Sequence, residues 1–540
     1  MQKFKWWNCS NSFCLESLKM FKKLFVLFKI GRKLSSSGTI SSIYEIYNPP
    51  ILIKIFFFII GLSFNNKRAT NNISDGAKLC NALQDMGTTF IKLGQFLATR
   101  PDIIGDDISK DLEKLQDKLP AFDLIIAKNI LEKELGKENF DKITNISEPI
   151  AAASIAQVHF ANINILGKKK DVAIKILRPD VEKVFNEELD ALMFLAYVVE
   201  SLVKKTKRLK LVEIVQLLRE ITNVEMDFRF EAAAASELYE NTKNDMGFKV
   251  PKIYWNQTSK KVLCLDRING VSIREVENLK SQNIDTQKLA KNIIQLFLRH
   301  AIRDGFFHAD MHQGNLFVLN DGTIVPVDFG IMGRLDKKNR KYLAEILYGF
   351  IKRDYQKVAE IHFVAGLVSN EFSKEDFAQS LRSIGEPIFG QAAKNISGGK
   401  LLSQLFENTE KFNMQTQIQL LLLQKTMVVV EGVARKLDPN TNIWNVSRPI
   451  IEDWLKKTKD PINKASEAIN EASEVIKRLP DLPLIMDRAN DVMTLMAEGK
   501  FNPNTLAYRN LREEELKLEL MRNKILGGVL VLVIFILIVF

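Results

Sequence analysis

The sequence predicts an α+β fold on three observations. Two β-rich runs within residues 154–177 are joined by a glycine-containing turn, helical periodicity dominates on both sides of them, and short strand-like runs follow at 260–268, 315–319 and 323–328. The 540 residues, 46% of them hydrophobic, can form about two to four domains with large cores. Four scattered cysteines exclude a disulfide scaffold and indicate reduced thiols facing a cytosol.

The remaining elements are expected to be helices. Helical patterns cover residues 75–140, with a turn near 119–121, and recur at 181–204, 211–240 and 286–303. Everything beyond about residue 337 also follows a helical pattern.

The C-terminus predicts a membrane anchor. The sixteen residues 525–540 carry no charge and are mostly Val, Leu, Ile and Phe, and Arg522 and Lys524 precede them. A helix needs ~20 residues to cross a bilayer, so the fit requires thinning, tilt or an extension toward Leu518. A buried core helix is the alternative. The flanking cations place the bulk of the protein on the cytoplasmic side.

The charge balance favours an anionic partner. The net charge is +11, and residues 1–35 hold seven Lys and one Arg among aromatic and aliphatic side chains. This predicts a basic amphipathic segment on an anionic membrane, with a solvated arm or an organellar transit peptide as alternatives. We expect no nucleic-acid binding, because no aromatic-interleaved basic module or helix-turn-helix is present.

Three motifs predict phosphate chemistry. Residues 172–175 read VAIK, residues 308–315 read HADMHQGN, and residues 328–330 read DFG. Chemistry on a nucleotide phosphate needs a cation for the α and β phosphates, a carboxylate to orient the nucleophile, and an amide with a second carboxylate for metal ions. These needs are met by Lys175, Asp310, Asn315 and Asp328. In this order the motifs match a two-lobed protein-kinase-like fold.

The two histidines of the second motif allow another interpretation. His308 and His312 are four residues apart and could form a metal pair. Without a third ligand in the sequence, we interpret His308 as the loop-stabilising histidine of the kinase pattern. His312 is then structural or adjacent to phosphate.

Further motifs resemble the UbiB family of atypical kinase-like proteins. Residues 92–95 read KLGQ, residues 225–227 read EMD, and residues 151–159 read AAASIAQVH where a protein kinase has a glycine-rich loop. The resemblance covers about residues 45–454. It implies an atypical bilobal kinase-like fold with a helical N-terminal extension over the active site and a helical C-terminal region, to which the sequence adds a C-terminal transmembrane helix.

The resemblance also implies a role for each motif residue. Lys175 would bind the phosphates with Glu231 as its helix partner, and Asp310 and Lys92 would be the other catalytic residues. Asn315 and Asp328 would hold Mg²⁺, and the regulatory motif facing the extension would comprise Gln95, Glu225 and Asp227. ATP would be covered by Ala152, Ala153, Ser154, Ile155, Ala156, Gln157 and Val158, with the adenine-contacting hinge near 263–266.

Alanine in place of glycine changes the nucleotide loop. It removes positions that adopt positive φ, so the loop cannot wrap phosphates as a glycine loop does. A helix start or tight packing is the alternative role for residues 151–153. Together with the second cation at Lys92, this loop suits controlled ATP hydrolysis or nucleotide sensing better than rapid protein phosphorylation. The chain departs from the family at Gln313, where proline is usual, and in having one apolar C-terminal run instead of two.

The implied function is that of a membrane-anchored atypical kinase or ATPase that promotes ubiquinone (coenzyme Q) biosynthesis at the cell inner membrane. It would handle polyprenyl precursors or regulate the biosynthetic enzymes, so the expected partners are membrane lipids, polyprenyl quinone precursors and ubiquinone biosynthesis enzymes. A non-catalytic, nucleotide-gated scaffold is the alternative. A prenylphenol hydroxylase is disfavoured because no flavin fingerprint or iron triad occurs.

These interpretations divide the chain into six parts. They are a basic membrane-associated region at 1–74, the helical K-x-G-Q extension at 75–140, an N-lobe at 141–270, a C-lobe at 271–455, an amphipathic helical linker at 456–524 and the anchor at 525–540.

Overall fold

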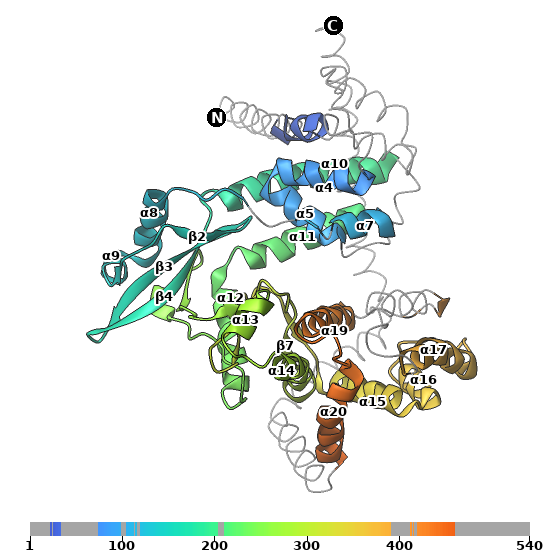
Figure 1. Cartoon of the computed structure of the whole chain (residues 1–540). Helices are drawn as coiled ribbons and strands as arrows, with labels where there is room; N and C mark the ends of the chain where they lie inside the picture. The colour runs from blue at the N-terminus through green and yellow to red at the C-terminus, as the bar shows by residue number, and fades with distance from the viewer. Residues whose placement is uncertain are drawn as a thin grey trace, which may run out of the picture. The chain divides into compact units, whose positions relative to one another are not determined.

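The structure is a computed structural model (Figure 1). It describes residues 22–33 except 24, 74–98, 104–115 except 113, 119–202, 210–389, 411–412, 414 and 418–459. The chain divides into two compact units, Met1–Leu455 and Lys456–Phe540. No helix within the described residues is long and apolar enough to cross a membrane. The predicted anchor at 525–540 lies outside the described residues, as do most of the basic N-terminal region and nearly all of the linker.

A five-stranded antiparallel sheet holds the predicted hairpin. Its path is β1-β3-β4-β5, and β2 also pairs with β3. The strands are β1 (Ile143–Thr144), β2 (Pro149–Ala152), β3 (Ala156–Ile165), β4 (Lys168–Leu177) and β5 (Val262–Asp266).

The hairpin turn is tighter than the sequence pattern indicated. Lys168 already pairs with Ile165, so the turn is Leu166–Gly167 and not residues 167–170. Both turn residues have positive φ, 49° and 76°, as a two-residue hairpin turn of this hand requires.

Strand alternation gives β4 two different faces. Val172, Ile174 and Ile176 are buried on one face, in a core shared with Ala127 and Leu131 of α8 (Leu124–Leu135). Neighbouring side chains on a strand point to opposite faces, so the residue between Ile174 and Ile176 points away from α8. That residue is the lysine of the VAIK motif.

Helices before and after the hairpin pack together. They are α4 (Asp75–Met86), α5 (Thr88–Ala98), α7 (Asp106–Leu112), α10 (Val181–Leu202), α11 (Leu211–Glu225) and α12 (Phe228–Thr242), whereas the short α9 (Lys137–Phe140) packs on α8. Leu83, Phe90, Leu112 and Ala191 share one core across α4, α5, α7 and α10. The single helix expected at 211–240 is wrong, because the chain breaks between α11 and α12.

The rest of the first unit is mainly helical, as the sequence predicted. A three-stranded sheet contains β6 (Val271–Ser272), β8 (Leu316–Val318) and β9 (Ile324–Pro326), and β7 (Phe306–His308) pairs with β10 (Met332–Arg334). A 3₁₀ turn covers Trp255–Gln257, and a π-helical turn, His300–Asp304, ends the expected helix at 286–303. The helices are α13 (Val276–Ser281), α14 (Thr286–Arg299), α15 (Lys337–Lys352), α16 (Tyr355–Val364), α17 (Lys374–Phe389), α19 (Ile418–Leu437) and α20 (Ile443–Lys459).

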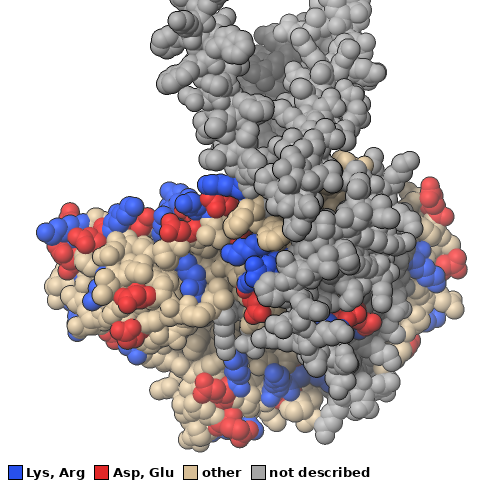
Figure 2. Space-filling view, turned by 90° about the horizontal axis from the view of Figure 1, so that it is seen from above, with Lys and Arg blue, Asp and Glu red and all other residues tan. Residues whose placement is uncertain are grey.

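One large core joins these helices. It runs through buried side chains of α12, α14 and α19, including Phe228, Phe297 and Val430. Figure 2 shows that Lys and Arg lie among Asp and Glu on the described part of one face. Strands β8 and β9, between the second and third kinase-like motifs, contribute Leu316, Val318 and Ile324 to this core, whereas Val172, Ile174 and Ile176 of β4 lie in the core shared with α8.

Candidate active site

Lys175 and Glu231 form the centre of the site. The Nζ atom of Lys175 lies 3.1 and 2.9 Å from the two carboxylate oxygens of Glu231, and 5.2 Å from the centroid of the Phe228 ring. The two charged side chains are only 18% and 7% exposed. Burial alone would lower the pKa of Lys175, but the carboxylates of Asp328 and Glu231 raise it above its ordinary value. Lys175 therefore stays charged at neutral pH and can bind phosphate.

The start of α12 positions Glu231. Asp227 caps this helix by accepting a hydrogen bond from the Arg229 N–H at 3.1 Å, and the Arg229 guanidinium donates to the same carboxylate at 2.6 Å. The Phe228 N–H donates to the Lys260 carbonyl just before β5. Glu231 lies one turn further on, where α12 faces β4.

The aspartate of the DFG motif reaches the same lysine. An Asp328 carboxylate oxygen lies 3.7 Å from Lys175 Nζ, and the Gly330 N–H donates to the other oxygen at 3.0 Å. Burial would raise the pKa of Asp328, but Lys175 and the Gly330 N–H outweigh it and hold the pKa at about 2. The neighbouring Phe329 is buried, and its N–H donates to Glu231 at 3.4 Å. Asp328 is therefore ionised at neutral pH.

The loop between β7 and β8 is held by its own side chains. The amide of Asn315 donates to the backbone carbonyl and the carboxylate of Asp310, at 3.1 and 3.0 Å. The Asp310 N–H donates to Nδ1 of His308 at 3.1 Å. From outside the loop, the Thr426 hydroxyl on α19 donates to the Ala309 carbonyl at 3.0 Å. These bonds fix the position of the Asp310 carboxylate.

Asn315 and Asp328 have the chemistry that Mg²⁺ requires. Asn315 precedes β8 and Asp328 follows β9, and the Val327 N–H donates to the Asn315 carbonyl at 3.0 Å, so the two residues share one edge of the hairpin. Asp328 supplies an ionised carboxylate, and the Asn315 amide uses its nitrogen on Asp310, which leaves its oxygen as the ligand atom. One or two such ligands plus substrate phosphates are what Mg²⁺ uses in nucleotide sites.

The histidine-pair alternative finds no support in the described residues. Nδ1 of His308 accepts from Asp310, and Nδ1 of His312 accepts from the Gly314 N–H at 2.9 Å. Nowhere in the described part of the chain do three or more His, Cys, Asp or Glu side chains form a metal-binding group.

The K-x-G-Q motif lies on α5, close to the site. Nζ of Lys92 is 2.9 Å from a carboxylate oxygen of Glu225, the last residue of α11, and both side chains are mostly buried, at 16% and 15% exposed. A Cβ atom on Gly94 would lie 2.3 Å from Cδ1 of Leu115 and 2.8 Å from Cδ1 of Leu83, so a larger residue here would require these side chains to move. The next residue, Gln95, is partly buried.

The two acidic residues of the E-x-D motif differ in their partners. Glu225 pairs with the extension through Lys92, whereas the Asp227 carboxylate is occupied by Arg229 as a helix cap. Lys92 also contributes to the lowered pKa of Asp328, and Glu225 to the raised pKa of Lys175. The extension therefore acts electrostatically on the Lys175 cluster.

The alanine-rich segment forms the end of β2, a tight turn and the start of β3. The Ala153 N–H donates to the Ala156 carbonyl at 2.8 Å, which closes the turn around Ser154 and Ile155. Val158 lies opposite Lys175 in the sheet. Residues 151–153 therefore do not start a helix.

Gln157 points to the other face of the sheet. It lies opposite Ile176, and its amide exchanges hydrogen bonds with the backbone N–H and carbonyl of Phe122, at 2.8 and 3.1 Å. The structure thus does not bring the Gln157 side chain to Lys175. The sequence did contain a signal for this orientation. Neighbouring residues of a strand point to opposite faces, so Gln157 cannot point to the same face as Val158, which lies opposite Lys175.

The sequence alone did not identify the residues that hold residues 151–156, which we call the alanine loop. Arg178, directly after β4, donates to the Ala153 carbonyl, and Thr88 on α5 donates to the Ser154 carbonyl. The only sequence signal was a cation immediately after the VAIK strand, three residues beyond Lys175.

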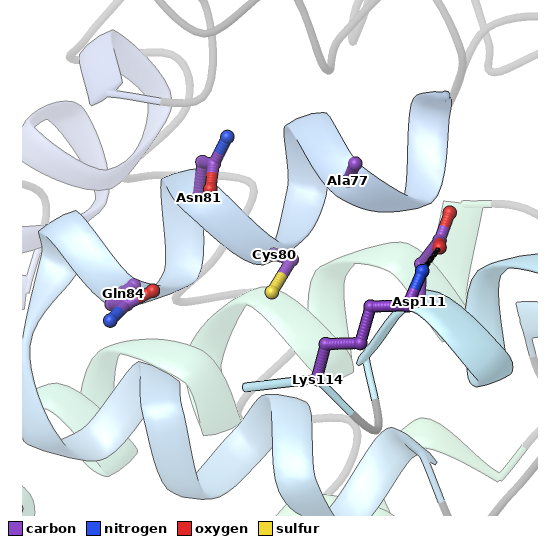
Figure 3. A pocket seen from close by; sticks show the side chains of 6 residues that line it. All are labelled: Ala77, Cys80, Asn81, Gln84, Asp111 and Lys114. Carbon is purple, nitrogen blue, oxygen red and sulfur yellow. Dashed lines mark hydrogen bonds and ion pairs between the residues drawn. The ribbon is translucent and has the colours of Figure 1, made fainter. Parts of the chain in front are cut away.

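A separate pocket of about 340 Å³ lies between α4 and the α7 region. Figure 3 shows Cys80, Asn81 and Gln84 on α4, with Asp111 and Lys114 opposite. Lys114 and Ser74 already bond the Asp111 carboxylate, and burial and Asp111 raise the pKa of the Cys80 thiol. With a paired carboxylate and a protonated thiol, this pocket lacks the free cation that nucleotide phosphates require.

Family models match two parts of the chain. Residues 114–362 match the ABC1 atypical kinase-like domain, and residues 381–442 match the UbiB helical domain. The first match contains the Lys175 cluster and the loop before β8. The second contains Thr426, which bonds that loop.

The chain is also similar to curated proteins named "Probable protein kinase UbiB". The protein from Marinobacter nauticus is 36% identical over 87% of this chain and 86% of its own length, and that from Pseudomonas paraeruginosa is 39% identical over 72% and 73%. A Mycobacterium tuberculosis protein solved in complex with erythromycin is 24% identical, with a TM-score of 0.45, over 68% of this chain and 93% of its own. The identity to the curated relatives over most of both lengths shows that the chain belongs to the UbiB family of atypical kinase-like proteins.

Proposed function

We propose that this chain binds Mg-ATP and hydrolyses it at a membrane surface to promote ubiquinone (coenzyme Q) biosynthesis. The observation that carries the proposal is the convergence of Lys175, Glu231 and Asp328 beside the loop in which Asn315 holds Asp310. These are the parts that phosphoryl transfer needs: a phosphate-binding cation, a metal-binding carboxylate and amide, and a carboxylate that orients the nucleophile.

Each residue has a defined task in this proposal. Lys175 binds the α and β phosphates, and Glu231 keeps its ammonium in place. Bound Mg²⁺, held by Asn315 and Asp328, would neutralise phosphate charge. Asp310 orients a water molecule whose oxygen forms a bond to the γ-phosphorus while the bond to the ADP oxygen breaks and the water proton passes to Asp310 or solvent.

The extension favours water over a protein as phosphoacceptor. Lys92 and Glu225 form a mostly buried ion pair next to the Lys175 cluster, in the region where the family resemblance implies that a protein substrate would otherwise lie. The same pair supports the second candidate, a nucleotide-gated scaffold. In that case nucleotide binding changes the position of the extension and hydrolysis is dispensable.

Phosphate release from Mg-ATP by the full chain tests the proposal. We would measure it with and without anionic lipid and a phenolic quinone precursor, for the wild type and Asp328→Asn. Asp321→Asn is the matched control, because Asp321 caps the turn at the opposite end of the β8–β9 hairpin. We expect Asp328→Asn to abolish release and the control to retain it.

The outcomes separate the candidates. Full activity in Asp328→Asn would refute the assignment of the site. Tight Mg-nucleotide binding without release by the wild type would favour the scaffold. A variant that binds nucleotide but cannot hydrolyse it also tests the scaffold. If this variant does not restore quinone synthesis, the result counts against the scaffold.

We further propose a single-pass anchor formed by residues 525–540, in the cell inner membrane with the catalytic body cytoplasmic. The uncharged run and its preceding cations, Arg522 and Lys524, support this proposal. Val533→Lys places a charge in the middle of the run and is expected to move the protein from the membrane to the soluble fraction. Asn523→Lys, just outside the run, is the control. Unchanged membrane recovery of Val533→Lys would contradict the anchor.

A further inference from the structure

Three consecutive carbonyls of the alanine loop accept hydrogen bonds from outside the loop. The Ala153 carbonyl accepts from the Arg178 guanidinium at 3.0 Å (Nε) and 2.8 Å (Nη2). The Ser154 carbonyl accepts from the Thr88 hydroxyl at 3.1 Å, and the Ile155 carbonyl accepts from the Arg178 N–H at 2.8 Å. A carbonyl oxygen facing a phosphate would repel it, so these bonds keep unfavourable dipoles away from a bound nucleotide.

Arg178 also holds the chain segment that leads into α8. Its Nη1 donates to the Pro120 carbonyl at 2.9 Å and its Nη2 to the Leu119 carbonyl at 3.3 Å, and its guanidinium lies 5.9 Å from the centroid of the Phe122 ring. One planar group therefore bonds backbone from two segments about thirty residues apart in the sequence. Arginine can do this because it has five donors in a rigid fork, whereas lysine has a compact ammonium.

The two donors connect the loop to the two cations of the site. Arg178 lies three residues after Lys175 at the end of β4, and Thr88 lies four residues before Lys92 on α5. Residues four apart lie on one face of a helix, so Thr88 and Lys92 move together. The position of the alanine loop is thus linked to Lys175 through Arg178 and to the extension through Thr88.

We propose that Arg178 is a positioning residue for nucleotide binding, assisted by Thr88. Together they hold the alanine loop in the conformation that accepts ATP, and they transmit the position of the extension to the loop. The inference rests on the proposed function, since it assigns these residues to the same nucleotide site. Neither side chain needs to touch the nucleotide.

The test compares Arg178→Met and Arg178→Lys with the wild-type full chain. The measurements are the Kd of Mg-ATP, the KM and kcat for phosphate release, the Tm, and amide hydrogen exchange of residues 151–156 without nucleotide. Arg219→Met is the matched control, because Arg219 bonds Asp190 at 2.7 Å between α11 and α10, away from the loop. Thr88→Val tests the hydrogen bond from α5 to the Ser154 carbonyl.

We expect Arg178→Met to raise the Kd and KM about tenfold, as loss of a few charged hydrogen bonds predicts, with kcat changed less than about threefold. The Kd and KM of Arg178→Lys should lie between those of Arg178→Met and the wild type, and Thr88→Val should raise the Kd about threefold. Exchange of residues 151–156 should rise in Arg178→Met and not in Arg219→Met, even if both lower the Tm.

Two results would overturn the inference in different ways. If the wild type binds Mg-ATP and Arg178→Met binds it equally well, with only the Tm lowered, Arg178 is a structural link and this inference alone fails. If the wild type binds no Mg-ATP, the proposed function fails and the inference fails with it.

Discussion

The two loops of the site are held in opposite ways. The loop from His308 to Asn315, the proposed catalytic loop, is braced mainly by its own side chains, which bond Asp310 from both sides. The alanine loop is held through its backbone, because Arg178 and Thr88 from other elements donate hydrogen bonds to its carbonyls. The position of the proposed catalytic loop is therefore fixed mainly by its own residues, whereas the position of the alanine loop is fixed by residues from distant parts of the chain.

The largest effect should come from breaking the catalytic loop from within. Asn315→Ala removes two bonds to Asp310 and one proposed metal ligand, so we expect kcat for phosphate release to fall about 100-fold or more. Asn320→Ala, in the exposed turn of the same hairpin, is the control. Activity within a few-fold of the wild type in Asn315→Ala would show that Asp310 does not depend on this brace.

Breaking the ion pair of the extension should give the next largest effect. Lys92→Met or Glu225→Gln alone leaves a mostly buried charge without its partner and should cost about 3 kcal/mol of stability. The double variant should lose less than the sum, with a coupling of about 1–3 kcal/mol in denaturant unfolding. Strict additivity would contradict a direct interaction.

Acidification should affect the two loops differently. Burial lowers the pKa of His308 below its ordinary value of 6.5, so the folded protein keeps it neutral while the unfolded chain binds a proton. Its contribution to stability is therefore present above about pH 6.5 and is lost as the pH falls, by at most about 1.4 kcal/mol per unit. Arg178 stays charged throughout this range.

Amide exchange at pH 7 and 5.5, corrected for the intrinsic rates, measures this difference. We expect protection of residues 308–315 to fall about threefold while residues 151–156 stay unchanged. His308→Gln should remove the pH response. An equal response of both loops would mean that the pH acts on the whole fold and not on His308.

The smallest effect should come from the outer brace of the catalytic loop. Thr426→Val keeps the shape of a fully buried side chain but removes the hydroxyl that donates to the Ala309 and Leu422 carbonyls, at a cost of about 1 kcal/mol. We expect kcat to fall about twofold. A loss as large as that of Asn315→Ala would show that α19, and not the loop itself, determines the loop conformation.

The same contrast explains what could be predicted from the sequence. The sequence pointed to Lys175, Asp310 and Asp328 as candidates because their motifs are local and phosphate chemistry needs their residue types, and the structure places Asp328 3.7 Å from Lys175. Glu231 and Lys92 came from the resemblance to the family, and the structure places them beside Lys175 and Glu225.

The partners of the alanine loop could not be found in this way. Arg178 and Thr88 donate hydrogen bonds to backbone carbonyls. Every residue has a backbone carbonyl, so no sequence motif marks these contacts. The π-helical turn His300–Asp304 and the cap formed by Asp227 also depend on local backbone geometry that helical periodicity does not show.

The extension has two parts that pack in different hydrophobic cores, and α8 is one of them. Ala127 and Leu131 of α8 cover the sheet, while Gln157 and Arg178 fasten the chain at Phe122, Pro120 and Leu119. Peeling α8 away would expose the hydrophobic face of β4 to water. Within the extension, α8 therefore belongs to the core of the five-stranded sheet, whereas α4, α5 and α7 share a different core with α10.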